Sequence, residues 1–357
     1  MTLLAVAVAA SLLCCIALIL SLKLLSPHIG LLDHPGGRKQ HDGATPLTGG
    51  VAMFGAVVVA DYIWGGAGEG AWWVASGTLV LVGALDDRFD LPVKIRFSAQ
   101  IFAVVSMVLG AGLELKTLGM FGASQPLMLG ILAVPFTIFA VVGVVNAMNM
   151  IDGMDGLAGG LALVTICAMA LLAVLGGQST AAAHLLVIAA AVVGFLFFNL
   201  RTPWRHKAAL FMGDAGSMFL GMVIAWYAVY LTQGDTAVMA PVTALWLFAV
   251  PLVDTITVMM RRVGKGQSPF RGDRKHLHHV LLRAGVTPGR SVGVIVATSF
   301  LFASIGLLGE IYGAPQGVML IGFSGIFALH YWATRRAWWL SKRLRRWREN
   351  SYAKGHA

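Results

Sequence analysis

Residues 157–200 read LAGGLALVTICAMALLAVLGGQSTAAAHLLVIAAAVVGFLFFNL, two apolar runs joined by a short glycine-containing turn. Each run has about the 20 residues that an α-helix needs to cross a hydrocarbon core of roughly 30 Å. Neither run alternates apolar and polar residues, as a transmembrane β-strand would. A helix satisfies its backbone hydrogen bonds internally, so this stretch predicts two membrane-spanning helices.

The rest of the chain repeats this pattern. Of the 357 residues, 58% are hydrophobic and 12% are charged, a balance that excludes a soluble globular domain of this size. Apolar runs predict eleven helices in a single transmembrane domain, residues 1–340, followed by a basic tail, residues 341–357. The predicted spans are 2–25, 47–64, 71–85, 96–111, 127–147, 157–176, 181–200, 211–232, 238–260, 291–312 and 317–336. The expected fold class is an all-α polytopic membrane protein.

Neither the first apolar run nor the cysteines have the sequence features of a secreted protein. The first run has no basic residue before Lys23 and is too long for the core of a signal peptide, so we expect an uncleaved first span. Cys14, Cys15 and Cys167 lie inside apolar runs, without the spacing of a disulfide framework or a thiolate metal site. They are interpreted as packing or lipid-facing residues.

Basic residues lie in alternate connections between the runs. Every Lys and Arg except Lys116 falls within or beside the tail and one set of loops, which are 26–46, 86–96, 148–156, 201–210 and 261–290. The positive-inside rule therefore predicts an external N-terminus and a cytoplasmic C-terminus. The net charge of +10 then reflects membrane topology and requires no nucleic acid. The Arg- and Trp-rich tail favours contact with an anionic lipid surface.

Six carboxylates gather on the predicted cytoplasmic side. Clustered carboxylates repel one another, so a shared site needs a compensating cation, and hard oxygen ligands suit Mg²⁺ or Mn²⁺. Each acid alone could be a helix cap or a solvated loop residue, but three groups at helix ends on one side favour a metal site. The six acids are Asp86, Asp87, Asp90, Asp152, Asp155 and Asp214.

Two glycine-rich segments precede apolar runs. They are DGMDGLAGG at residues 152–160 and GDAGS at residues 213–217. Glycine allows close approach of the backbone to a ligand, and helix N-termini bind phosphate. The alternative for Gly159 and Gly160 is close packing between spans.

Two basic loops contain histidine. The segment RGDRKHLHHVLLRAG, residues 271–285, carries three histidines beside Arg and Lys. Adjacent His278 and His279 cannot easily face one ion on a helix, and no Cys or carboxylate completes a zinc set. A sugar or phosphate ligand is favoured over a solvated basic loop. RKQHDGATPLTGG, residues 38–50, carries Lys39 and His41 and is weak evidence taken alone.

Five motifs in this order, over about residues 33–283, make the chain resemble the polyprenyl-phosphate N-acetylhexosamine-1-phosphate transferases. This membrane family also contains the muramoyl-pentapeptide translocase. The resemblance implies transfer of a sugar 1-phosphate from a UDP-sugar to undecaprenyl phosphate at the cytoplasmic face of a bacterial inner membrane. It also implies UMP release, a need for Mg²⁺ and compatibility with a homodimer. The motifs are RKQHDGATPLTGG, GALDDRFDLPVKIRFSAQ, NAMNMIDGMDGLAGG, FMGDAGS and DRKHLHH.

The resemblance also implies residue roles. Asp214 resembles the principal magnesium ligand, and Asp86 and Asp87 resemble the paired acids that assist the metal or the acceptor phosphate. The expected catalytic acids are Asp86, Asp87, Asp90, Asp152 and Asp155. The expected substrate-binding residues are Lys39, His41, Arg88, Asn149, Arg274, His276, His278 and His279.

The histidine order indicates the donor. HLHH differs from the consecutive histidines typical of the muramoyl-pentapeptide branch and resembles the branch that uses UDP-N-acetylglucosamine. We therefore expect N-acetylglucosamine 1-phosphate transfer, the first membrane step of an envelope glycan such as an O-antigen. Another UDP-hexosamine or UDP-muramoyl-pentapeptide is the alternative donor. Direct attack by the lipid phosphate and an aspartyl-phosphate intermediate both stay open.

Two other functions compete with this one. A membrane prenyltransferase would use Asp86, Asp87 and Asp90 to bind prenyl diphosphate through Mg²⁺. A transporter would carry ionisable residues deep in its spans, where only Asp254 qualifies. The remaining candidates, Asp61, His184 and Glu310, are expected at solvated outer ends of helices.

Overall fold

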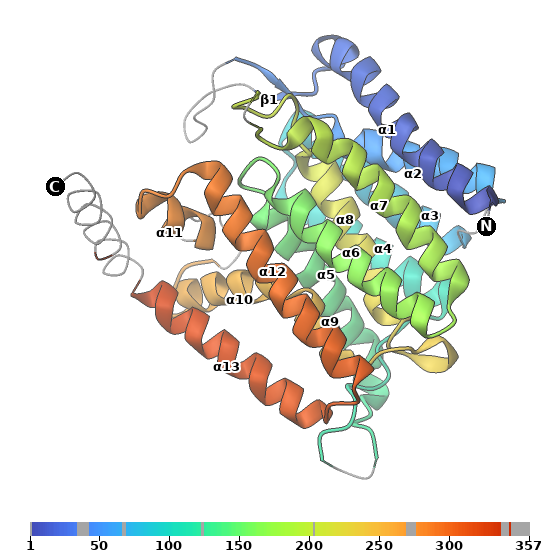
Figure 1. Ribbon diagram of the computed structural model, residues 1–357, viewed down its shortest axis with the longest axis vertical. Helices are drawn as coiled ribbons and strands as arrows, with labels where there is room; N and C mark the ends of the chain where they lie inside the picture. The colour runs from blue at the N-terminus through green and yellow to red at the C-terminus, as the bar shows by residue number, and fades with distance from the viewer. Residues whose placement is uncertain are drawn as a thin grey trace.

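The computed structural model describes residues 2–33, 43–65, 69–122, 125–202, 204–268, 276–336 and 343, and these are mostly helical (Figure 1). The long helices are α1 (Thr2–Ile29), α2 (Gly49–Trp64), α3 (Gly70–Phe89), α4 (Val93–Ala111), α5 (Ala133–Ile151), α6 (Leu157–Leu175), α7 (Ser179–Asn199), α8 (Gly213–Tyr230), α10 (Ala249–Val263), α12 (Pro288–Ile311) and α13 (Gln316–Arg335). The short helices are α9 (Pro241–Leu247), α11 (Leu277–Arg283) and two 3₁₀ turns, Gly130–Leu132 and Gly234–Thr236. Strands β1 (Leu32–Asp33) and β2 (Thr45–Pro46) pair antiparallel.

Fewer described helices are long and apolar enough to cross a membrane than the eleven that were predicted. Each of the eleven apolar runs is helical over most of its length. Seven described helices are long and apolar enough to cross a membrane, or eight if the bent pair α9 and α10 forms one span. The chain is thus an all-α polytopic membrane protein, and the count of eleven stays a prediction.

Two predicted loops are much shorter in the structure. The predicted loop 86–96 shrinks to residues 90–92, because α3 ends where Asp90 adopts a left-handed φ of 51° and Pro92 follows. A residue before proline disfavours the helical region, so Leu91 cannot readily continue the helix. The predicted loop 148–156 likewise shrinks to residues 152–156. Asp86, Asp87 and Asn149 therefore lie on rigid last turns of helices.

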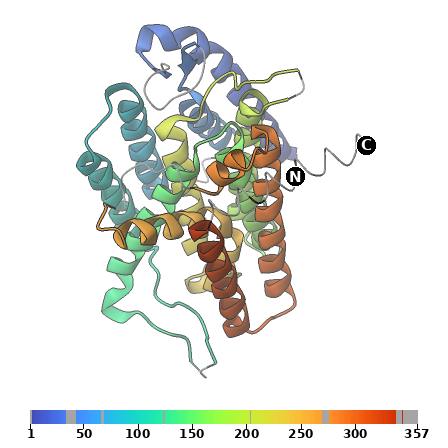
Figure 2. The ribbon, with the colours of Figure 1, turned by 90° about the vertical axis from the view of Figure 1, so that its left-hand side faces the viewer.

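The predicted span 238–260 is broken instead of continuous. Helices α9 and α10 meet at Phe248 with a bend of 85°, and α10 lies across the other helices (Figure 2). Pro251 has no N–H for the carbonyl of Leu247, four residues earlier. The hydroxyl of Thr165 donates to that carbonyl at 2.9 Å, which satisfies it within the apolar interior.

Helix α8 forms the centre of the bundle. It packs against α2, α3, α5 and α6, and it is buried along almost its whole length. The turns that carry the motifs, including β1, α11 and the segment after α7, lie at one end of the bundle in Figure 1. The segments 112–122 and 231–240 lie at the other end. The central helix therefore presents its N-terminus to the motif-bearing end.

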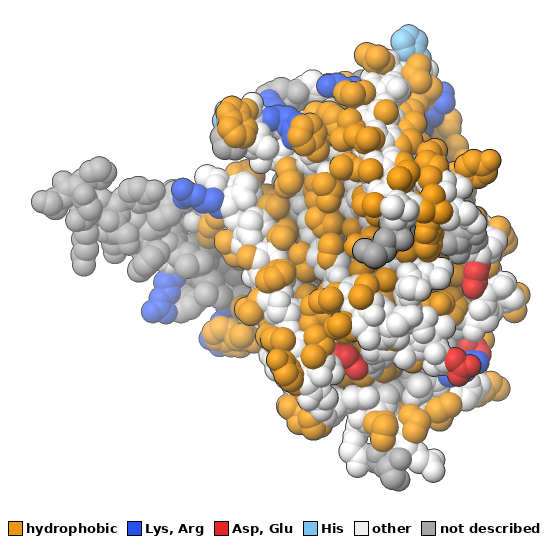
Figure 3. Space-filling view, turned by 45° about the vertical axis from the view of Figure 1, so that its right-hand side comes forward, with side chains coloured by type: hydrophobic (Ala, Val, Ile, Leu, Met, Phe, Trp, Pro, Cys, Tyr) orange, Lys and Arg blue, Asp and Glu red, His pale blue; other side chains and the backbone are white. Residues whose placement is uncertain are grey.

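Side-chain type varies along the molecule's surface. Apolar side chains cover much of the face in Figure 3, many Lys and Arg side chains appear at its upper and left edges, and the visible Asp and Glu side chains lie lower down. The expectation that Asp61, His184 and Glu310 lie at solvated helix ends is wrong for Asp61 and His184. Asp61 is 3% exposed and His184 is 4% exposed, and His184 Nδ1 lies 2.5 Å from the hydroxyl of Tyr227.

Candidate active site

Asp86 and Asp214 are joined by a residue that the sequence reasoning missed. Arg96, on the first turns of α4, places Nη1 2.8 Å from Asp86 Oδ2 and 3.4 Å from Asp214 Oδ2. The other oxygen of Asp86 accepts a hydrogen bond from the backbone N–H of Leu91 at 2.7 Å. Arg96 lies in the quoted motif GALDDRFDLPVKIRFSAQ, but its position at the start of an apolar run concealed its role. It partly neutralises the acid cluster.

Asp87 binds the N-terminus of the central helix. Its Oδ1 accepts from the backbone N–H of Asp214 at 2.8 Å, and its Oδ2 accepts from that of Ala215 at 3.2 Å. A carboxylate at this position satisfies unpaired N–H groups and interacts favourably with the helix dipole. Gly213 has a φ of 71°, and a Cβ there would lie 2.3 Å from Asp87 Oδ2. Glycine is therefore required for this contact.

Asn149 holds the second oxygen of Asp214. Its Nδ2 donates to Asp214 Oδ1 at 2.7 Å and to the hydroxyl of Ser217 at 3.0 Å. Asp214 thus receives Asn149 from α5 on one side and Arg96 from α4 on the other. Motif residues from α3, α5 and α8 thus meet at one point.

Glycines bring these helices into backbone contact. A Cβ at Gly50 of α2 would lie 2.1 Å from the backbone nitrogen of Gly216, and a Cβ at Gly83 of α3 would lie 2.4 Å from Ala215 Cα. Small residues allow such close approach between membrane helices. Since Gly83 lies one turn before Asp87, this contact sets how near the carboxylate comes to α8.

The two acids of the 152–156 loop have different surroundings. Burial, followed by the charges of Asp87 and Asp155, raises the pKa of Asp152 to about 7. Asp155 has partners outside the acid cluster: its Oδ2 accepts from Arg201 Nε at 2.8 Å and from the backbone N–H of Ala208 at 3.2 Å. Asp152 therefore lies beside the acid cluster, whereas Asp155 ties the loop to the segment after α7.

The histidine loop packs onto the same acidic loop. His276 and His278 are 4% and 2% exposed, and their rings stack 5.7 Å apart. A Cβ added to Gly153 would lie 2.7 Å from His278 Nε2, so the imidazole rests directly on this glycine. Burial and then the charges of His279 and His276 lower the pKa of His278 to about 3, which makes it neutral. The ring centre of His279 lies 4.2 Å from that of His278.

The remaining expected residues are outside this cluster or outside the described residues. Arg88 is exposed, stacks over the ring of Phe89 at 4.9 Å and packs against Gly30. Asp90 is exposed at the end of α3. The expected substrate-binding residues that lie outside the described ranges are Lys39, His41 and Arg274.

The carboxylates have the oxygen chemistry of a Mg²⁺ site but are not yet arranged around one ion. In the described residues, no three His, Cys, Asp or Glu side chains converge as a metal-binding group. Arg96 lies between Asp86 and Asp214, and both oxygens of Asp87 accept backbone N–H groups. The Arg96 side chain is 29% exposed, so the protein does not enclose it on every side.

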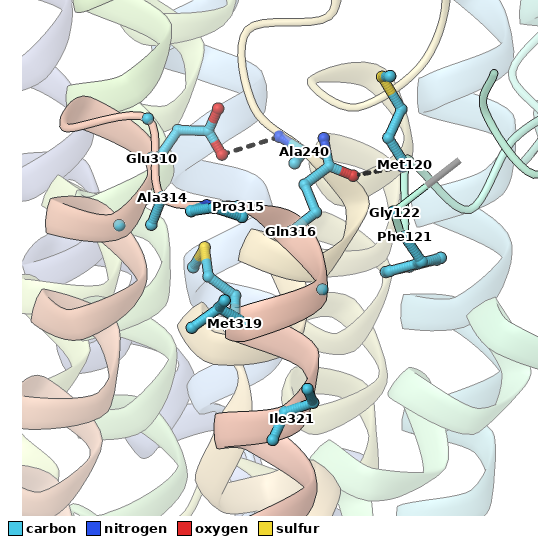
Figure 4. A pocket seen from close by; sticks show the side chains of 14 residues that line it. Met120, Phe121, Gly122, Ala240, Glu310, Ala314, Pro315, Gln316, Met319 and Ile321 are labelled. Carbon is cyan, nitrogen blue, oxygen red and sulfur yellow. Dashed lines mark hydrogen bonds between the residues drawn. The ribbon is translucent and has the colours of Figure 1, made fainter. Parts of the chain in front are cut away.

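Of two cavities, the smaller one lies beside the acid cluster. A recess of about 60 Å³ lies beside the acid cluster, between α4, α5 and α8, and is lined in part by Arg96 and Asn149. A cavity of about 700 Å³ lies at the opposite end of the bundle (Figure 4). Its carboxylate, Glu310, already accepts from the backbone N–H of Ala240 at 2.9 Å and from the hydroxyl of Thr243. We place the candidate active site at the smaller recess, because two of its lining residues, Arg96 and Asn149, contact the acid cluster.

Comparison with known proteins shows the family of this chain. Residues 70–232, which hold the acid cluster, match the family described as Glycosyl transferase family 4. The chain is 39% identical to an undecaprenyl-phosphate alpha-N-acetylglucosaminyl 1-phosphate transferase of Haemophilus influenzae, over 90% of this chain and 91% of that protein. It is 38% identical to the protein of that name from Salmonella typhimurium, over 90% of each chain. The Escherichia coli O157:H7 protein is 37% identical, over 89% of this chain and 87% of its own.

Proposed function

Because the chain belongs to the polyprenyl-phosphate N-acetylhexosamine-1-phosphate transferases, we propose that it transfers N-acetylglucosamine 1-phosphate from UDP-N-acetylglucosamine to undecaprenyl phosphate. The products are undecaprenyl-diphosphate-N-acetylglucosamine and UMP. The observation that carries the proposal is the meeting of Asp86, Asp87, Asn149 and Asp214 at one end of the helical bundle. These residues come from three motifs far apart in the chain.

The membrane location suits the two substrates. The acceptor's long apolar chain stays in the bilayer while its phosphate meets a water-soluble nucleotide at the surface. The positive-inside rule supports an active site on the cytoplasmic face of a bacterial inner membrane, with the N-terminus outside. The product would begin an envelope glycan such as an O-antigen.

The reaction joins two anionic phosphates. An oxygen of the lipid phosphate attacks the β-phosphorus of the donor, the new P–O bond forms, and the bond to UMP breaks with UMP as leaving group. The second pKa of a phosphate monoester is about 6, so the acceptor is mostly dianionic at neutral pH and needs no strong general base. Charge neutralisation and alignment then dominate the barrier, and we favour direct in-line attack.

We assign Mg²⁺, or Mn²⁺ in its place, to the cluster of Asp214 and Asp86. When bound, the ion neutralises charge on the diphosphate and the attacking phosphate. Turning of the Arg96 guanidinium would free one oxygen of each acid and bring a cation toward the phosphates. Asp87 holds the N-terminal turn that carries Asp214, and Asn149 orients the Asp214 carboxylate.

The histidine loop supplies the recognition of the sugar. The His278 ring lies against Gly153 of the 152–156 loop, and the His276 ring stacks on that of His278. Neutral His278 can accept or donate a hydrogen bond to a sugar hydroxyl or acetamido group. Another UDP-hexosamine or UDP-muramoyl-pentapeptide is the alternative donor, and it would change this loop's partners without changing the phosphate chemistry.

A transporter is the rival from another class. It would need ionisable groups along a water-filled path through the spans. Asp254, the acid expected to serve such a path, has 0% exposure and is held by His276 and His330. This arrangement favours the enzyme. A prenyltransferase would require Asp90 beside Asp86, whereas Asp90 is exposed at the end of α3.

The test is UMP release by purified protein with undecaprenyl phosphate and UDP-N-acetylglucosamine. We expect release only with both substrates and Mg²⁺, loss with EDTA and loss in Asp214→Ala. Asp235→Ala, at an exposed acid of the opposite end, is the matched control and should retain activity. Turnover with a different UDP-sugar alone would revise the donor. No UMP from any donor would reject the transferase.

A further inference from the structure

A buried carboxylate lies between the histidine loop and the last helix. Asp254 of α10 is 0% exposed. Its Oδ2 accepts from His276 Nδ1 at 2.8 Å, and its Oδ1 lies 3.3 Å from His330 Nε2 on α13. The backbone N–H of Leu277 also donates to Oδ1, at 3.0 Å. A buried charge is costly unless it is paired, so the carboxylate depends on the donors of His276 and Leu277 and on the nearby imidazole of His330.

Asp254 fixes both the ring and the backbone of His276. A carboxylate only accepts hydrogen bonds, so its contact requires that His276 Nδ1 carry a proton and sets the orientation of the ring. His276 is also the residue that begins α11, where its carbonyl accepts from the N–H of His279 at 3.0 Å. The bond from Leu277 to Asp254 anchors the same turn. One carboxylate thus holds the whole N-terminal turn of α11.

Contacts between side chains link the residues that Asp254 holds to the acid site. The ring of His276 stacks on that of His278 with an interplanar angle of 6°. His278 rests on Gly153, the residue after Asp152. A shift of the Asp254 contacts would therefore move the two imidazoles relative to the 152–156 loop.

We propose that Asp254 and His330 are positioning residues for the UDP-sugar donor, because together they hold His276 and the start of α11 against the acidic loop. His330 lies on α13, outside every motif that suggested the function, and its side chain is 16% exposed. The inference rests on the proposed function, since it concerns recognition at that site. Neither residue contacts the reacting phosphates in this assignment.

The test separates donor recognition from chemistry. In His330→Ala, Asp254 loses the imidazole that lies 3.3 Å from its Oδ1, so the α11 turn should loosen. We expect the KM for UDP-N-acetylglucosamine to rise about tenfold, with kcat and the KM for undecaprenyl phosphate within about twofold of wild type. His330→Gln can place an amide N–H near the position of Nε2 and should restore most of the donor KM. His330→Asn is one carbon shorter and should behave like the alanine variant.

A double variant tests whether Asp254 and His330 act together, and a control variant tests whether the effect is specific to His330. Adding His330→Ala to Asp254→Asn should raise the donor KM less than it does in the wild type, because the two residues act through one contact. Ser324→Ala, which removes an exposed hydroxyl bonded only within α13, is the matched control and should leave both KM values unchanged. If His330→Ala fails to fold, His330→Asn supplies the same comparison.

Three outcomes would overturn the proposal. They are an unchanged donor KM in both short variants, an equal loss for both substrates, and no rescue by glutamine. Failure of the proposed function is a different result, because wild-type protein would then release no UMP from any UDP-sugar. An active wild type with an unaffected His330→Ala variant rejects only the positioning role.

Discussion

The contact between α3 and α8 allows a quantitative test of how the acid site is assembled. In Gly83→Ala, the new Cβ would lie 2.4 Å from Ala215 Cα and 2.5 Å from its nitrogen, both backbone atoms. Ordinary contact begins at 3.4 Å, so the two helices must separate by roughly 1 Å. The bond of 2.8 Å from the Asp214 N–H to Asp87 would then stretch to about 3.8 Å, beyond hydrogen-bond range.

The expected effect falls mainly on activity. Overpacking costs about 1–3 kcal/mol, which a large helical bundle should tolerate. A displacement of about 1 Å at reacting groups lowers the rate by roughly 100-fold. We therefore expect Gly83→Ala to be purified as a monodisperse protein, with UMP release under saturating substrates reduced by about two orders of magnitude.

The matched control lies on the same helix. In Gly77→Ala the nearest atom to the new Cβ is Phe54 Cζ at 3.6 Å, an ordinary contact, so activity should stay near wild type. Equal turnover by Gly83→Ala and Gly77→Ala would refute the argument that backbone contact between α3 and α8 sets the position of Asp87. A Gly83→Ala protein that does not fold would mean that the contact governs assembly of the whole bundle.

Three further predictions concern the loops around the acid cluster. Gly153→Ala should displace His278 and raise the donor KM severalfold in steady-state assays. Because the pKa of Asp152 is raised to about 7 from 3.8, the folded state retains a proton that the unfolded chain loses, so stability should fall between about pH 4 and 7. Asp152→Asn should flatten this fall in thermal unfolding with EDTA. Asp155→Ala and Arg201→Ala should lower activity equally, without further loss in the double variant.

Each of these has its own contrary result. Gly143→Ala, where no atom lies within 4 Å of the new Cβ, should leave the donor KM unchanged, and an equal rise in both variants would remove His278 from the explanation. An Asp152→Asn protein with the wild-type dependence on pH would assign the titration to another group. Loss of all turnover in Asp155→Ala with full activity in Arg201→Ala would give Asp155 a direct catalytic role.

Much of the fold class followed from local pattern. Apolar runs of helical length predicted where the helices lie, because burial in lipid depends on side chains that are neighbours in the chain. Helix ends were less accurate. The predicted loop 86–96 is mostly helical and the predicted loop 148–156 is helical up to Ile151, since intrahelical hydrogen bonding continues until a residue such as Asp90 or a proline stops it. At the bend near Phe248, the carbonyl of Leu247 accepts a hydrogen bond from Thr165, a partner from another helix.

Some residues of the candidate site could likewise be predicted from the sequence, and others could not. The acids on one face, the glycines beside them and the histidine loop could be named from sequence, because each motif is a continuous segment whose chemistry is legible in its own residues. Arg96, the anchoring of Asp155 by Arg201 and the contact of Asp254 with His330 could not. These contacts join residues brought together only when the helices pack, and many packings are compatible with the same hydrophobic pattern.

The sequence by itself therefore determined that this protein lies in a lipid bilayer, the order of its motifs and the kinds of groups at its site. The tertiary structure alone decided which oxygen of each carboxylate is committed to a helix end, a guanidinium or an amide. The physical reason is that hydropathy acts along the chain, whereas hydrogen bonds and charge pairs depend on distances of a few ångströms between helices. Close backbone contact at Gly50 and Gly83 sets those distances.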